Sequence, residues 1–314
     1  MNDPEPLLGI AAVEREVGVS KDVLRVWERR YGFPAPRRDR HGERVYPADQ
    51  VDRLRLVKRL MDQGHRPGKL LSRSCDELEA LAGSIATDTS ADTPASAATG
   101  TAEAVLATLE SHDATGLARL LQQQLALQGL ADFVQDTIAP LATVIGDGWA
   151  HGRLRVFEEH LFTETCARVL RQAIAALPPG HRPTVLLTTA PEESHGLGLL
   201  MVESLLALHG ARCIALGTAM PVIEIARAAI VYEADVVALS FSSAFPARRA
   251  AGVLQQLREA LPPTIEIWAG GSGVKRMREV AGVRVLAELA DAVARVRELQ
   301  DERGLPAPAR GVAQ

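Results

Sequence analysis

One histidine stands where parallel α/β proteins bind their ligands. His195 follows the apolar, strand-like run 185–189, and Gly196 and Gly198 open the amphipathic stretch that comes next. This order predicts the first strand, loop and helix of an α/β domain, with His195 at the carboxyl end of the strand. An imidazole in that position can ligate a metal ion. Taken alone, a loop histidine is more often an ordinary solvated side chain.

Two further loops supply polar and small residues. Ser240 and Ser242 follow the strand-like run 236–239, and a pair of glycines, residues 270–271, follows the run 265–269. In a flavodoxin-like strand order, 2-1-3-4-5, the loops after the first and third strands flank the switch point where ligands bind. The imidazole, the hydroxyls and the glycines are therefore expected to line one crevice.

This set of residues resembles the cobalamin-binding module. The chain reads Glu-x-His-x-x-Gly, Ser-x-Ser and Gly-Gly, where the module usually has Asp-x-His-x-x-Gly, Ser-x-Leu or Ser-x-Thr, and Gly-Gly. The resemblance implies that His195 replaces the cofactor's own dimethylbenzimidazole as the lower cobalt ligand. The two serines would contact the displaced nucleotide tail, which the glycines would let lie close to the backbone. The cofactor-binding residues so assigned are Glu193, His195, Gly198, Ser240, Ser242, Gly270 and Gly271.

Glu193 is a candidate partner for the other ring nitrogen of the histidine. A carboxylate that accepts this proton orients a metal-bound imidazole and raises its basicity. Glutamate departs from the usual aspartate and is longer by one methylene, so this contact is a weaker prediction than the ligation itself.

The positive charge is concentrated near the N-terminus. Residues 21–73 contain fifteen Lys or Arg and seven Asp or Glu, a local net charge of +8. Because the whole chain carries −4, the remainder carries −12. A basic segment on an acidic chain indicates a polyanionic partner for that segment alone.

The basic segment has the pattern of a winged helix-turn-helix. Residues 7–18 have helical apolar spacing, a turn follows with Ser20 as the expected N-cap, and a second helix is predicted over residues 21–30. That helix should bury Val23, Leu24 and Trp27 and present its basic side chains to solvent. Residues 37–46 read as a hairpin wing with a turn near residues 41–42.

The run Arg-x-Trp-Glu-Arg-Arg-Tyr-Gly-Phe-Pro at 25–34, with Arg-x-Tyr at 44–46, looks like the head of MerR-type transcription regulators. The resemblance implies operator DNA as partner, with the second helix in the major groove and the wing on phosphates or the minor groove. The residues expected to contact DNA are Lys21, Arg25, Arg29, Arg38, Arg40, Arg44 and Tyr46. Any single arginine here could instead be a solvated surface charge.

The rest of the chain divides by composition. We predict a head over residues 1–80, a polar, flexible linker over 81–102, a four-helix bundle over 103–178, an α/β domain over 181–302 and a tail over 303–314. The expected fold is therefore multidomain: a winged helix-turn-helix, a helical bundle and a flavodoxin-like (Rossmann-like) domain. No long heptad helix follows the head, so oligomerisation is assigned to the C-terminal part.

The predicted bundle contains a tryptophan and, further along the chain, a Glu-His pair. Nine residues separate Trp149 from Glu159-His160. In an arbitrary bundle these residues would be core and surface. Before a cobalamin module, the spacing resembles the bundle cap of CarH-type (LitR-type) light-sensing repressors, which bind adenosylcobalamin. The resemblance implies that Trp149 covers the upper face and the adenosyl group, and that Glu159 binds its ribose.

One position departs from that family. The histidine that can take the upper cobalt position after light directly follows the Trp in the family, but here Ala150 intervenes and His151 lies one residue on. One helical residue turns a side chain by about 100°. The upper ligand is therefore left open between His151, His160 and water.

The resemblance implies a cobalamin-dependent, light-responsive repressor that binds DNA as a dimer or tetramer in the dark. The alternatives are a light-independent cobalamin or tetrapyrrole sensor, a head with a degenerate sensor, and a methyltransferase or mutase subunit. No substrate domain is visible, so we do not expect an enzyme. Apolar runs are too short to span a bilayer, no secretory start is present, and three scattered cysteines suit a reducing cytoplasm.

Overall fold

The computed structural model describes residues 7–62, 65–86, 97–150 and 152–302. These residues form two compact units. The first contains the described residues up to 86 together with those of 147–155. The second contains residues 97–146 and 156–302.

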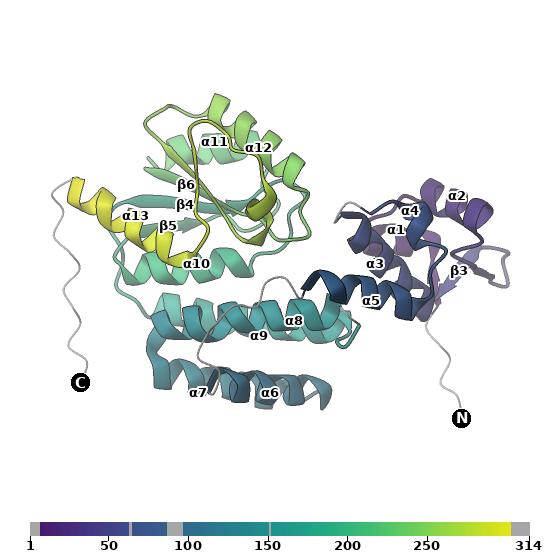
Figure 1. Cartoon of the computed structure of the whole chain (residues 1–314). Coiled ribbons are helices and arrows are strands. Elements are labelled where there is room, and N and C mark those ends of the chain that lie inside the picture. The colour runs from purple at the N-terminus through teal and green to yellow at the C-terminus, as the bar shows by residue number, and fades with distance from the viewer. Residues whose placement is uncertain (1–6, 63–64, 87–96, 151, 303–314) are drawn as a thin grey trace. The chain divides into compact units, whose positions relative to one another are not determined.

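The first unit begins with a small winged-helix fold (Figure 1). Its three strands form an antiparallel sheet in the order β1-β3-β2. The predicted first helix begins later than expected, because residues 7–9 pair with β3 as a strand instead. The elements are β1 (Leu7–Gly9), α1 (Ile10–Val17), α2 (Lys21–Tyr31), β2 (Arg37–Arg38), β3 (Arg44–Pro47), α3 (Ala48–Asp62), α4 (Pro67–Leu70) and α5 (Cys75–Ala86).

The turn between α1 and α2 is built as the sequence predicts. Gly18 ends α1 with a φ of 70°, and the Ser20 hydroxyl accepts a hydrogen bond from the Val23 backbone N–H. Leu24 and Trp27 are buried in the core, but the prediction for Val23 was wrong, since 38% of it is exposed. Val23 lies about 100° around the helix from Leu24, which turns it away from the core.

Helices enter the predicted linker from both sides. α5 continues to Ala86, and the next helix, α6, begins at Ala97. The central part of the predicted linker, residues 87–96, lies outside the described residues, as does the predicted tail 303–314.

The helical region of the second unit contains the four predicted helical segments. They are α6 (Ala97–Glu110), α7 (Ala114–Asp132), α8 (Ala139–Ala150) and α9 (Val156–Ala175), of which α8 crosses into the first unit after Gly146. The predicted short connection between the second and third segments is instead a π-helical turn, η2 (Phe133–Ile138). The wider turn lets four neighbouring residues of η2 be buried together: Phe133, Val134, Thr137 and Ile138.

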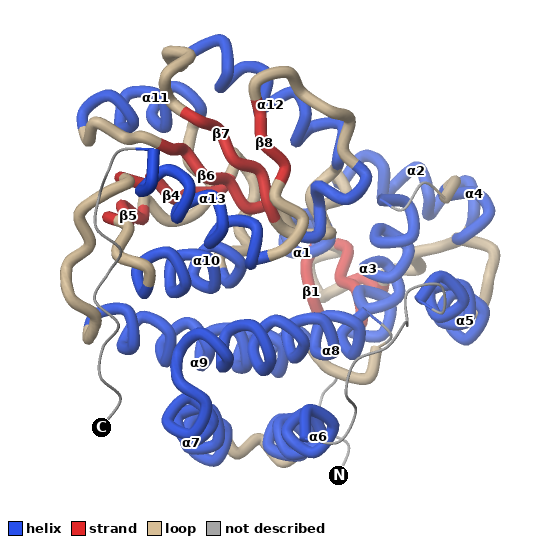
Figure 2. The backbone as a smooth tube through the Cα atoms, turned by 60° about the vertical axis from the view of Figure 1, so that its left-hand side comes forward, coloured by secondary structure: helices blue, strands red, loops and turns tan. Residues whose placement is uncertain are grey.

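The α/β domain has a five-stranded parallel sheet in the order β5-β4-β6-β7-β8 (Figure 2). In order of occurrence this is 2-1-3-4-5, so the predicted flavodoxin-like topology is confirmed. The elements are β4 (Thr184–Thr189), α10 (Leu197–Leu208), β5 (Arg212–Ala215), α11 (Val222–Val231), β6 (Val236–Ser240), α12 (Ala247–Ala260), β7 (Glu266–Gly270), η3 (Ser272–Arg276), β8 (Val283–Val285) and α13 (Leu289–Glu302).

Two apolar cores hold this sheet. One joins its strands to α11 and α12, and the other joins them to α10 and α13 on the opposite face. α10 also packs against α9, so the helical region lies beside that face (Figure 1). The strand register sets Thr189 opposite Ser240 and Ser240 opposite Gly270. The three loops that carry the predicted cofactor residues therefore leave the sheet at one level.

Among the described residues, we find no helix that combines the length and apolar character needed to cross a membrane.

Candidate functional site

His195 lies in the loop between β4 and α10 and is held by the carboxylate two residues before it. Its Nδ1 lies 2.6 Å from Glu193 Oε1, and its backbone N–H donates to the same oxygen at 3.0 Å. The imidazole itself is 59% exposed. One edge of the ring is thus fixed while the other faces solvent.

Glu193 is the centre of the arrangement. It is 2% exposed, and its second oxygen, Oε2, accepts hydrogen bonds from the backbone N–H and the hydroxyl of Ser242 at 2.9 and 2.8 Å. Burial acts to raise the pKa of Glu193, but the hydrogen bonds from His195 and Ser242 outweigh it and lower that pKa. The carboxylate is therefore ionised at neutral pH and links the loops after β4 and β6.

An ionised carboxylate only accepts hydrogen bonds, so the proton on this edge of the ring belongs to His195 Nδ1. The ring's other nitrogen, Nε2, is then the one available to a metal. The hydrogen bond to Glu193 raises the pKa of His195 against the effect of burial, and the charge of Glu159 acts in the same direction. A more basic imidazole is a stronger metal ligand.

The same loop is fastened by residues that the sequence did not single out. The Thr189 hydroxyl donates to the Glu193 carbonyl at 2.5 Å and accepts from the Ala219 N–H at 2.8 Å. Glu192, whose φ is 69°, also forms an ion pair with Arg249 on α12 at 2.7 Å, but both side chains are exposed, so this pair contributes little. The only sequence signal for Thr189 was its position as the last residue of the strand.

Close packing between this loop and its neighbours requires glycine at two of the predicted positions. A Cβ at Gly198 would lie 2.7 Å from the Ser240 hydroxyl, and one at Gly271 would lie 2.4 Å from the Phe241 carbonyl. Gly271 also has a φ of 90°, which disfavours other residues. The two glycines therefore let the loops after β4, β6 and β7 pack closely together. The exposed imidazole that Glu193 holds in the first of these loops fits the lower ligand of a cobalamin.

Ser242 has a partner other than the predicted one. Its backbone N–H and its hydroxyl both donate to Glu193, so neither is available to donate to a nucleotide tail in this arrangement. Ser240, which faces Gly198, remains the better candidate for that contact. Gly270 ends β7 and, with Gly271, begins the third loop.

The structure describes some of the residues that were predicted to cover the upper face of the cofactor. Glu159 is held by His160 Nδ1 at 2.8 Å and by the Thr163 hydroxyl at 2.9 Å. Its negative charge contributes to the raised pKa of His195. Trp149 belongs to the first unit, so its contact with the cofactor stays a prediction. His151 lies outside the described residues.

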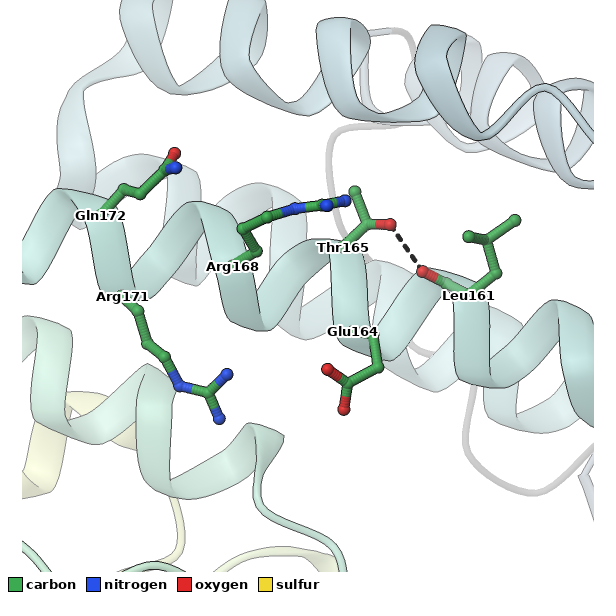
Figure 3. A pocket seen from close by; sticks show the side chains of 6 residues that line it. All are labelled: Leu161, Glu164, Thr165, Arg168, Arg171 and Gln172. Atoms are coloured by element: carbon green, nitrogen blue, oxygen red, sulfur yellow. Dashed lines mark hydrogen bonds between the residues drawn. The ribbon is translucent and has the colours of Figure 1, made fainter.

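A pocket of about 510 Å³ on α9 does not coincide with this site. Arg171 and Glu164 point to one side of the helix, and Arg168 and Gln172 point to the other (Figure 3). Leu161 and Thr165 complete the lining, and none of the six is a predicted cofactor residue. The site at His195 is therefore defined by its hydrogen bonds and glycines.

The basic residues of α2, which are predicted to contact DNA, lie on one exposed face of the helix. Lys21, Arg25 and Arg29 recur every four residues and are exposed, so they share one face of the helix. Arg25 forms an ion pair with Asp22 at 3.4 Å, and both side chains are exposed. Val23 and Val26, also exposed, add apolar contact surface to this helix.

The predicted wing is formed by β2 and β3, with its turn at residues 39–43. Asp39 accepts hydrogen bonds from the backbone N–H groups of His41 and Glu43, and Gly42 has a φ of 80°. Arg38 donates to the Gly42 carbonyl, and Arg40 lies 3.0 Å from a ring nitrogen of His41. Both arginines are exposed at the wing, as predicted for phosphate contacts.

Two other residues that were predicted to contact DNA, Tyr46 and Arg44, make contacts within the head instead. Tyr46 is fully buried in the head's core, and among the described residues its hydroxyl finds no hydrogen-bond partner. Arg44 pairs with Glu28 of α2 at 2.8 Å, which raises the pKa of its guanidinium. Residues 44 and 46 lie on the same face of β3, so this face brings Arg44 to Glu28 and Tyr46 into the core, a consequence that the sequence motif did not show.

Comparison with known proteins agrees with this organisation. Three family models match the chain: the MerR HTH family regulatory protein over residues 8–70, and B12 binding domains over 101–174 and 183–297. The chain is 33% identical to the HTH-type transcriptional repressor CarH of Myxococcus xanthus, over 84% of this chain and 88% of that protein. It belongs to the CarH family of MerR-type regulatory proteins with B12-binding domains.

A second member of this family and one solved structure complete the comparison. The HTH-type transcriptional repressor CarA of Myxococcus xanthus is 30% identical over 85% of this chain and 88% of its own. The Methanosarcina barkeri monomethylamine corrinoid protein has a TM-score of 0.50 and 15% identity, and covers 62% of this chain and 95% of its own. At that identity the likeness shows the fold alone.

Proposed function

We propose that this chain is a transcriptional repressor that binds operator DNA as an oligomer when adenosylcobalamin is bound in the dark, and that light releases it. The observation that carries this proposal is the imidazole of His195, oriented by a buried carboxylate where glycine-containing loops pack closely, in a chain that also has a basic winged head. The repressor names of CarH and CarA support the same reading.

His195 is proposed to bind cobalt through Nε2. Glu193 would keep the ring in one tautomer and orientation, and Ser242 would keep Glu193 in place. Gly198 and Gly271 would let the nucleotide tail lie against the backbone, with Ser240 at its side.

Glu159 and Trp149 are proposed to hold the adenosyl group on the other face of the cofactor. The Glu159 carboxylate is already held by His160 and Thr163, so it can accept a ribose hydroxyl without first being ordered. When bound, adenosylcobalamin would supply a cobalt–carbon bond that light can break. Departure of the adenosyl group would remove the contacts of Glu159 and Trp149. His151, His160 or water would then complete the upper side.

The head is proposed to bind DNA through α2 and the wing. A single head offers few phosphate contacts, so joining heads in one assembly raises the apparent affinity by about 10² to 10⁴. Loss of assembly in the light would therefore release DNA without any change in the head itself.

The test is size-exclusion chromatography with visible spectra, combined with operator binding, on protein incubated with adenosylcobalamin in the dark and after green light. The proposal predicts a coloured, larger dark species that binds operator DNA and becomes smaller and weaker-binding in the light. Dark assembly that also forms with methylcobalamin and survives light would contradict the light response and favour the second candidate, a light-independent cobalamin sensor. Ala150, at the family's histidine position, is the observation that favours this candidate.

A further inference from the structure

The outer face of α11 carries an unusual concentration of exposed apolar side chains. Ile223, Ile230 and Val231 are 57%, 55% and 75% exposed. The exposed large apolar residues elsewhere in this unit are dispersed over several elements. Neighbouring exposed apolar residues of this kind mark interaction surfaces, whereas scattered ones need no explanation.

The helix has two distinct faces. Ile225, Ala226 and Ala229 are buried in the core that α11 and α12 make with the sheet. At about 100° per residue, Ile223, Arg227 and Ile230 lie within about 60° of one another on the outer face. Glu224 and Val231 flank them. We call these five residues the α11 strip: Ile223, Glu224, Arg227, Ile230 and Val231.

The charges of one α11 strip are complementary to those of a second copy of the strip. Arg227 and Glu224 form an ion pair at 2.6 Å, and both side chains are largely exposed. An exposed pair at this spacing contributes little stability, so its members can exchange partners readily. A surface with one acid and one base is matched by a second copy of itself turned by 180°.

We infer that the α11 strip is a contact between two copies of this chain, in which the two α11 helices pack antiparallel. With Ile223 opposite the partner's Ile230, Arg227 comes within about 3 Å, along the helix axis, of the partner's Glu224. The apolar side chains then cover one another while both ion pairs form between copies. This inference rests on the proposed function, because it names the surface through which the repressor assembles.

The first test replaces both isoleucines, Ile223→Asp with Ile230→Asp, in the full chain. The matched control is Leu127→Asp, since Leu127 is an exposed leucine of α7 outside the strip. Sedimentation equilibrium is measured with adenosylcobalamin in the dark and without cofactor. The dissociation constant of the assembly should be at least about tenfold higher for the double variant than for the unaltered chain. The control should match the unaltered chain.

The second test leaves the apolar residues in place. Glu224→Arg gives a strip with two basic residues, and Arg227→Glu gives one with two acidic residues. Each variant should self-associate at least about tenfold more weakly, because like charges would face each other. Mixing the two in equal amounts should restore a one-to-one assembly through ion pairs that can form only between copies.

The outcomes separate the two proposals. If the unaltered chain assembles and neither pair of variants changes this, the α11 strip is not the contact, although the proposed function stands. If the spectra show no bound cofactor, the proposed function fails, and the mixed variants still decide the strip. An unaltered chain that stays monomeric with and without cofactor overturns the inference, as does a mixture of variants that stays monomeric.

Discussion

The loop that carries His195 and the face formed by α2 and the wing both depend on charged side chains. The charge is buried in the loop and exposed on the face of the head. Glu193 is buried and accepts four hydrogen bonds, so the imidazole beside it has one orientation. Lys21, Arg25 and Arg29 remain exposed on their helix. A metal ligand must be preorganised, whereas contacts with DNA use long, hydrated cations that adapt to the duplex.

The largest effect should come from removing the side chain of Tyr46, which is buried in the core although it was expected to contact DNA. Tyr46→Ala should destabilise the head by about 3 to 5 kcal/mol, because it leaves a large cavity. Tyr46→Phe should keep both stability and operator affinity within about 1 kcal/mol, since its hydroxyl has no partner among the described residues. Thermal unfolding and a gel shift would check both. A loss of DNA affinity in the folded Phe variant would show that Tyr46 does act at the interface.

His195→Ala should weaken cobalamin binding by at least about 100-fold, because the proposed lower ligand is lost. His181→Ala, an exposed histidine outside the site, is the control. Titration followed by the visible spectrum measures both, and DNA binding by the head should not change in cofactor-free protein. Equal affinities in the two variants would mean that cobalt is held by another group.

Glu193→Gln should weaken binding by about 10- to 100-fold, because an amide accepts fewer hydrogen bonds and is uncharged. The adjacent Glu192→Gln removes only an exposed ion pair and should change affinity less than about threefold. The same titration compares them. If the two variants were equally weakened, the buried position of Glu193 would have no special role.

In the head, Arg40→Ala should lower the slope of log affinity against log salt by about 0.9, the value for one lost phosphate contact. Arg44→Ala should leave the slope nearly unchanged, because Arg44 is paired with Glu28. Operator binding measured at several salt concentrations gives both slopes. A larger slope change for Arg44 would return this residue to the set of direct contacts.

Sequence reasoning predicted the residues at the strand ends, because strand spacing and glycine positions are local properties. It predicted the sheet order only by assuming a flavodoxin-like arrangement, which the structure confirms. It also predicted that Glu193 faces His195, since two residues in one loop can meet without the rest of the fold. It could not show that Ser242 serves Glu193, because that contact joins loops 49 residues apart. Nor did it show the burial of Tyr46 or the pairing of Arg44, which depend on how β3 packs against α2.

The measurement that tests the central claim most directly is the electron paramagnetic resonance spectrum of the bound cofactor in its Co(II) state, with and without ¹⁵N-labelled histidine in the protein. Ligation by His195 predicts that the nitrogen splitting changes from three lines to two on labelling, and that His195→Ala abolishes this change. A three-line splitting that persists in the labelled protein would mean that the cofactor keeps its own base, and would contradict the proposed role of the His195 loop.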